Sequence, residues 1–168
     1  MKKIYSLVAA LVVAMVVLAS CGASSAYQAQ LDAAKSAIEA KDANTAFAKV
    51  KEVIAGDKVT ADDAVICTMY ALNAYAVASE KAGGPQALPL NDNLDLCKQV
   101  VAAYNKAKTF PEADVNKANA AIQLVAGYDV MNTAAGYIQS VASIEQAIQA
   151  AQQAAAEEEA DAEEGEEE

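Results

Sequence analysis

The sequence predicts an all-α protein in which about six helices pack as antiparallel helical hairpins. Of its 168 residues, 55% are hydrophobic but only 5% are aromatic, and tryptophan is absent. Alanine and short aliphatic residues therefore supply most of the apolar surface, and alanine is the strongest helix former. Apolar residues also recur every three or four positions through the body of the chain, which is the helical period. Runs of β-branched and aromatic residues, which are typical of strands, are nearly absent.

The first two helices are expected between Tyr27 and Gly56. Leu31 and Ile38 follow Tyr27 at helical spacing. Asp42 can cap the second helix, because its carboxylate can accept hydrogen bonds from the backbone N–H groups of the first turn. Gly56 suits the C-terminal turn of that helix.

The third expected helix runs from Ala61 to about Lys81 and is apolar on nearly every side. A helix with this pattern is buried between its neighbours. Thr60 offers a cap for it, and Asp63 lies three residues later, which makes a variant of the capping box with Asp in place of Glu.

Helix breakers separate the last three expected helices. The segment from Gly83 to Pro89 ends the third helix, and the fourth begins at Asn91 or Asp92. The later boundaries are Pro111 at the first position of the fifth helix, Gly127 between the fifth and sixth helices, and the end of the sixth helix near Ala156.

Charge and composition exclude several classes of function. The formal charge is −11, and all 12 basic residues are lysine, so neither histidine nor arginine is present. An acidic chain without arginine lacks the basic surface that nucleic-acid binding needs. Histidine is the usual general base and metal ligand near neutral pH. No nucleotide-binding, serine-hydrolase or zinc-protease motif occurs, so we expect a non-enzymatic protein with no cofactor, no metal and no evident small-molecule substrate.

Residues 1–20 have the features of a secretory signal peptide. Lys2 and Lys3 precede an uncharged stretch rich in Leu, Val and Ala, which is shorter than the roughly 20 apolar residues of a comfortable membrane span. The stretch ends in Leu-Ala-Ser followed by Cys21 and Gly22. This tetrapeptide resembles the lipobox of bacterial lipoproteins. The resemblance implies cleavage before Cys21, a diacylglycerol on its thiol and acylation of the new amino terminus.

The resemblance also predicts a location in the bacterial cell envelope, with the chain anchored to a membrane by lipid. Gly22 takes the place of the Asp that retains enterobacterial lipoproteins at the inner membrane, which favours the outer membrane. Two or three acyl chains anchor a protein firmly, whereas one is marginal. Residues 21–26 then form a short lipidated spacer before a helical domain that we expect over residues 27–156.

The last twelve residues, 157–168, form an acidic segment with nine Asp or Glu and no lysine. A run of like charges without apolar residues stays disordered and extended. Negative charge also opposes the dipole at the C-terminal end of a helix. This tail is either a solubilising end or a brush that attracts cations or a basic partner.

The spacing of small residues between Ala34 and Lys58 resembles a tetratricopeptide repeat. In this family Ala46 would lie where the two helices touch, and Val50 and Ile54 would pack on the next pair. The tryptophan and the closing proline of the family pattern are absent. The later helix pairs match the family only in their alternation of helices and short connections. A repeat-like array and an irregular helical bundle both remain open.

Few residues of the helical domain stand out as functional candidates. Cys67 and Cys97 could form a disulfide between the third and fourth helices outside the cytoplasm, or could be buried apolar thiols. Tyrosines on helices are usually core residues, but they can also line a ligand groove. The expected partner contacts are therefore the loop after the third helix and two tyrosines: Gly83, Gly84, Pro85, Leu88, Pro89, Tyr75 and Tyr104.

Together these features predict a membrane-anchored envelope lipoprotein whose helical module binds a protein or peptide. The alternative is a structural envelope lipoprotein that acts through abundance and its acidic tail, without a specific ligand.

Overall fold

The computed structural model describes residues 25–164, with side chains through residue 156. The predicted signal peptide, Cys21 and residues 165–168 lie outside the described residues. Six α-helices and one 3₁₀ turn make up the described chain, which contains no strand: α2 (Gln28–Glu39), α3 (Ala43–Ile54), α4 (Ala61–Ala82), η1 (Pro85–Ala87), α5 (Leu90–Lys108), α6 (Glu112–Ala126) and α7 (Val130–Glu164). The prediction of an all-α protein with six helices is confirmed.

Local signals in the sequence start two of these helices as predicted. The Thr60 hydroxyl accepts a hydrogen bond from the Asp63 N–H (3.2 Å), and the Asp63 carboxylate accepts one from the Thr60 N–H (3.1 Å). This reciprocal capping box satisfies two donors that a helix start leaves free. Asp42 caps α3 by accepting hydrogen bonds from the N–H and the hydroxyl of Thr45, at 3.1 and 2.6 Å. Pro111 precedes α6 as its N-cap rather than forming its first residue.

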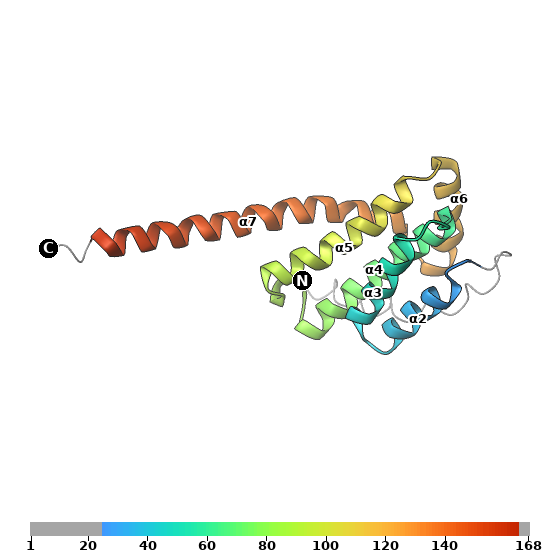
Figure 1. Cartoon of the computed structure of the whole chain (residues 1–168), viewed down its shortest axis with the longest axis horizontal. Coiled ribbons are helices and arrows are strands. Elements are labelled where there is room, and N and C mark those ends of the chain that lie inside the picture. The colour runs from blue at the N-terminus through green and yellow to red at the C-terminus, as the bar shows by residue number, and fades with distance from the viewer. Residues whose placement is uncertain (1–24, 165–168) are drawn as a thin grey trace.

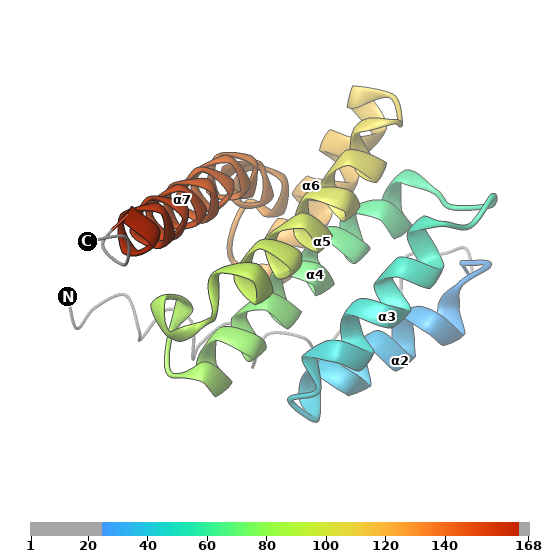
Figure 2. The same ribbon diagram turned by 60° about the vertical axis from the view of Figure 1, so that its left-hand side comes forward.

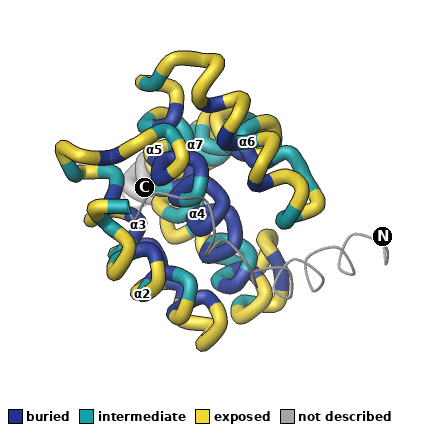
Figure 3. Tube along the Cα trace, turned by 90° about the vertical axis from the view of Figure 1, so that its right-hand side faces the viewer, coloured by how far each residue is buried: buried dark blue, intermediate teal, exposed yellow. Residues whose placement is uncertain are grey.

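The fold is built around α4, which is buried on most sides, as its all-round apolarity predicts. Figure 2 shows α3, α4 and α5 side by side, with α2 beyond α3 and α7 beyond α5. The tube in Figure 3 is dark blue along much of α4, whereas the outer helices expose one face. The core therefore follows the axis of α4, and the helices around it form a single layered body.

The order of packing departs from successive hairpins after α5. Helices α2 to α5 each pack on the next, but α6 packs mainly on α4, and α7 packs on α5. The reason is that α4 has more apolar surface than α3 and α5 can cover. Val115, Ala118 and Ile122 of α6 are buried and cover that remaining surface. The third helix pair therefore does not repeat the arrangement of the first two.

Helix α7 is the longest element and extends far beyond the other helices (Figure 1). It is described through Glu164, past the end that the sequence predicts near Ala156. Alanine and glutamate are both strong helix formers, which favours continuation of the helix past that position. The disorder of the acidic tail over residues 157–168 stays a prediction. Among the described helices, none combines the length and the apolar character that a bilayer crossing requires.

Candidate functional site

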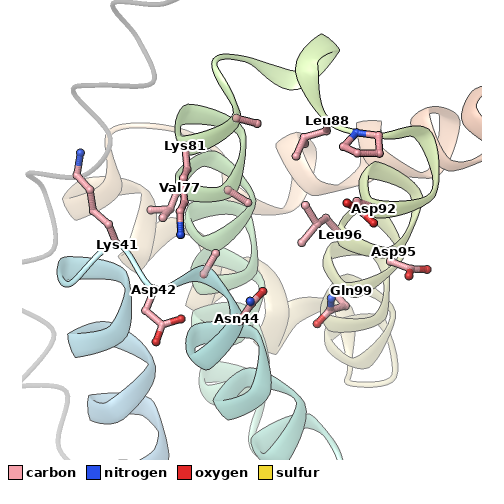
Figure 4. A pocket seen from close by; sticks show the side chains of 14 residues that line it. Lys41, Asp42, Asn44, Val77, Lys81, Leu88, Asp92, Asp95, Leu96 and Gln99 are labelled. Atoms are coloured by element: carbon pink, nitrogen blue, oxygen red, sulfur yellow. The ribbon is translucent and has the colours of Figure 1, made fainter.

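One cavity lies over the C-terminal half of α4, between the start of α3 and the first half of α5. Its volume is about 630 Å³. Figure 4 shows Val77 and Lys81 of α4 on one side and Leu88 and Leu96 on the other. The side chains that line it come from three helices and the loop before α5: Lys41, Asp42, Asn44, Val77, Lys81, Leu88, Pro89, Asp92, Asp95, Leu96 and Gln99, among others.

A second hollow of about 590 Å³ continues this cavity along α3 and α5. Asp95 and Gln99 line both hollows, so the two form one elongated depression, which we call the α3–α5 groove. The second half is the more apolar one, and it is lined by Phe47, Val50, Lys51, Ile54, Ala55, Lys98 and Ala102 in addition to the two shared residues.

Charges of both signs surround an apolar floor at the wide end of the groove. Lys41 pairs with Glu80 of α4 at 3.2 Å, outside the groove. Lys81 pairs with no acid among the described residues. The hydrogen bonds from Thr45 hold the pKa of Asp42 below its usual value, so this carboxylate is charged at neutral pH. Apolar anchors beside fixed charges are the features that bind a peptide by side-chain burial and polar contacts.

The loop that was predicted as a partner contact is the part that closes the wide end. Gly83 ends α4 in the left-handed region, at φ 92°, which favours glycine because a Cβ is strained there. The N–H of Gly84 then donates to the Ser79 carbonyl at 2.8 Å. This turn and the short η1 place Leu88 and Pro89 against the groove. Gly83, Gly84 and Pro85 shape the turn and do not line the groove themselves.

Tyr75 lies on the opposite side of α4 from the groove, because it is two residues from Val77 and so points to another face. Its hydroxyl donates to the Asn93 amide oxygen at 3.0 Å. Its ring meets Tyr137 of α7 edge-on, with centroids 4.9 Å apart. Burial raises the pKa of Tyr75. Tyr75 therefore joins α4, α5 and α7, beside a separate hollow of about 440 Å³.

Tyr104 lies in a third place, at the far end of α5. It lines a small hollow of about 280 Å³ with Phe110 and Met131. The expected contact residues therefore lie in three places, and of them only Leu88 and Pro89 line the α3–α5 groove. The sequence could not show this, because tyrosines at helical spacing do not reveal which face of the bundle they join.

The two candidate disulfide cysteines are free, buried thiols in the structure. The Sγ of Cys97 contacts the Asn93 amide oxygen at 3.5 Å, beside Tyr75. Cys97 therefore lies at the level of Tyr75 on α4. Tyr75 is eight residues beyond Cys67, so the two cysteines are offset by about 12 Å along the axis of α4. A disulfide requires Cα atoms within about 7 Å. Burial raises the pKa of Cys67 to about 12 and also raises that of Cys97, so both thiols are protonated and unreactive.

Several residues that line the groove carry no distinguishing signal in the sequence. Val77, Leu96 and Gln99 belong to ordinary helical periods, and no local motif distinguishes them from other positions of α4 and α5. Lys41 and Lys81 resemble any exposed lysine in the sequence. Their common location arises from the packing of α3 and α5 on either side of α4.

Within the described part of the chain, no three Cys, Asp, Glu or His side chains cluster as a metal site. The groove offers binding surface and hydrogen-bonding groups. Comparison of the chain with models of protein families, with curated proteins and with solved structures finds no match.

Proposed function

We propose that the chain is a lipid-anchored bacterial envelope lipoprotein, without enzymatic activity, whose helical domain binds a protein or peptide in the α3–α5 groove. The observation that carries this proposal is the groove itself. It is elongated and open, it has accessible apolar residues at Leu88, Leu96 and Ile54, and it carries charges at both ends. These features suit a short helix or an extended peptide segment.

The lipid anchor rests on the sequence around Cys21. A short basic start, an apolar stretch and a lipobox-like tetrapeptide occur in the right order. Replacement of the acylated thiol should abolish anchoring, because the acyl chains supply the membrane affinity. We therefore expect Cys21→Ser to be unprocessed or released from membranes on fractionation. A variant that stays wholly in the membrane with normal processing would contradict the anchor.

The groove can be tested by site-specific photo-crosslinking in intact cells. A crosslinking amino acid at Gln99 lies at the junction of the two halves of the groove. The same amino acid at Gln123, which is exposed on α6 and lines none of the cavities above, is the matched control. We expect a discrete adduct from Gln99 and none from Gln123. Equal adducts from both positions, or none from Gln99, would contradict binding in the groove.

The alternative function is that of a structural lipoprotein that acts through its acidic tail. Nine acids among residues 157–168 and a helix that continues outward to Glu164 favour it. The two functions differ in their dependence on the tail. If the Gln99 adduct persists after deletion of residues 157–168, the groove is the binding site. If binding is salt-sensitive and disappears with the tail, the tail is the functional part.

A further inference from the structure

The two ends of the helical domain differ in what they carry. At one end, the Tyr27 hydroxyl donates to the Asp57 carboxylate and accepts from the Lys58 N–H, both at 3.3 Å. These bonds fix the start of α2 against the loop between α3 and α4. Since α5 runs antiparallel to α4, its C-terminus and the α5–α6 loop lie at this same end, which we call the anchor end.

The opposite end contains the loop from Gly83 to Pro89 and the wide mouth of the groove. Helix α4 separates the two ends, and its 22 residues span about 33 Å at 1.5 Å per residue. Figure 1 shows α7 leaving the body on the side away from the start of α2. We call this the outer end.

The length of chain before Tyr27 limits how far the anchor end can move from a membrane. Residues 22–26 separate Cys21 from Tyr27. Six Cα–Cα steps join Cys21 to Tyr27, so a fully extended chain reaches at most about 22 Å between them. With lipid on Cys21, the anchor end therefore stays within this distance of the bilayer surface.

Charge decides between an upright domain and one that lies flat. The anchor end itself is nearly balanced in charge, because four lysines without an ion pair within the described residues lie among five acids that are likewise unpaired: Lys51, Lys58, Lys106 and Lys108 against Asp57, Asp62, Asp63, Glu112 and Asp114. The outer end adjoins the α7 arm, which leads to nine acids without one lysine. An anionic phospholipid surface therefore repels the acidic arm much more strongly than it repels the nearly balanced anchor end.

We propose that the domain stands on the membrane with its anchor end toward anionic phospholipid headgroups and its groove mouth and α7 directed away from them. This inference rests on the lipid anchor of the proposed function. An upright domain presents Leu88 and Pro89 to partners in the aqueous space, at about the length of α4 from the lipid, rather than to neighbours in the same bilayer.

Depth-dependent quenching of a fluorophore on single introduced cysteines tests the orientation. The suitable positions are exposed: Lys58→Cys at the anchor end, Gln86→Cys at the outer end and Ala150→Cys on α7. The native thiols of Cys67 and Cys97 are 0% and 1% exposed, and the Cys21 thiol is acylated, so the unsubstituted chain serves as the unlabelled control. The full lipidated chain is placed in vesicles of phosphatidylethanolamine and phosphatidylglycerol that contain a nitroxide-headgroup lipid.

The first readouts are intact mass and co-flotation with vesicles, which decide whether the chain is lipid-anchored at all. A chain without lipid would contradict the proposed function. For an anchored chain, we expect loss of fluorescence at Lys58→Cys, little loss at Gln86→Cys and none at Ala150→Cys. Equal quenching at the three positions, or stronger quenching at the outer end, would overturn the orientation while leaving the anchor intact.

A higher salt concentration distinguishes an orientation that depends on charge from one that depends only on the length of the N-terminal tether. At molar salt the Debye length falls to about 3 Å, so repulsion of the acidic arm is screened. We expect quenching at Gln86→Cys to increase under these conditions. An unchanged difference between Lys58→Cys and Gln86→Cys would contradict the role of charge in the orientation.

Discussion

The phenol ring of Tyr27 lies directly against Gly56, so closely that a Cβ at Gly56 would overlap the ring. The sequence suggests Gly56 for its conformational freedom at the end of α3. In the structure, however, Gly56 is not among the residues with positive φ. Glycine is needed there for close approach, because the ring must reach over it to bond with Asp57 and Lys58.

We therefore expect Gly56→Ala to destabilise the protein. The added methyl group must displace the Tyr27 ring and break its hydrogen bonds, at a cost of roughly 1–3 kcal/mol. Chemical denaturation followed by circular dichroism measures this change. The cost should largely disappear when Gly56→Ala is combined with Tyr27→Ala, because the two residues are in contact. Additive effects would contradict the contact.

Gly136 on α7 is the matched control for that substitution. Nothing lies within 4 Å of the position that its Cβ would take, and its φ is an ordinary one. Alanine favours the helix over glycine by about 1 kcal/mol. Gly136→Ala should therefore raise the free energy of unfolding by up to that amount, and a loss of stability would show that α7 is packed more closely than the structure indicates.

Two partly buried tyrosines, Tyr128 and Tyr75, should respond in opposite directions to loss of their hydroxyl groups. The Tyr128 hydroxyl is buried with no hydrogen-bond partner among the described residues, so Tyr128→Phe removes a desolvation cost of roughly 1 kcal/mol and stabilises the protein. The Tyr75 hydroxyl bonds to Asn93. Tyr75→Phe leaves that amide oxygen without this donor, which should cost about 1 kcal/mol. Urea denaturation of both variants measures the difference, and the same sign for both would contradict these assignments.

Buried phenols should make the fold sensitive to alkali. Burial raises the pKa of both Tyr70 and Tyr128 from 10 to about 12, and it raises the pKa of Tyr137 as well. Between pH 10 and 12 the unfolded chain binds fewer protons than the folded one at these sites, so stability falls as pH rises. One pKa unit corresponds to about 1.4 kcal/mol, so each of the two shifts removes on the order of 2–3 kcal/mol by pH 12.

Urea denaturation across this alkaline range measures the loss, and the absorbance of tyrosinate reports the ionisation directly. The Tyr128→Phe variant should lose part of the pH dependence while keeping the fold. A free energy of unfolding that stays constant from pH 10 to pH 12 would show that these phenols are accessible to solvent.

The buried thiols predict a simple labelling pattern. Cys67 and Cys97 should resist alkylation in the folded protein, because both are enclosed and protonated. Both should take up one alkyl group each after unfolding without a reductant. Intact-mass measurement reads the result. A requirement for reductant before labelling would show that the two cysteines are bonded.

The sequence predicted those parts of the fold that depend on neighbours along the chain. Asp42, Thr60 and Gly83 act within one turn of their own helix ends, so capping and termination can be recognised from residue type and spacing. The all-round apolarity of α4 likewise indicates burial wherever that helix lies.

The candidate site was only partly predictable. Leu88 and Pro89 stand in a conspicuous loop and line the groove, whereas Tyr75 and Tyr104, which the sequence also offers as contacts, line other hollows. Val77 and Tyr75 are two residues apart on one helix and differ by about 200° around its axis. Which of these faces opens onto a groove depends on the helices that cover α4.

By itself, the sequence determined the helical class, the helix boundaries that local capping sets, the acidic character of the tail and the lipobox-like segment before the domain. Tertiary structure decided that α6 covers α4 while α7 packs on α5, that the cysteines stay apart, and that α3 and α5 border a groove. The physical reason is the distance along the chain over which each kind of interaction acts. Caps and periodicity act over a few residues of one chain segment, whereas a groove exists only where surfaces distant in sequence meet and leave space between them.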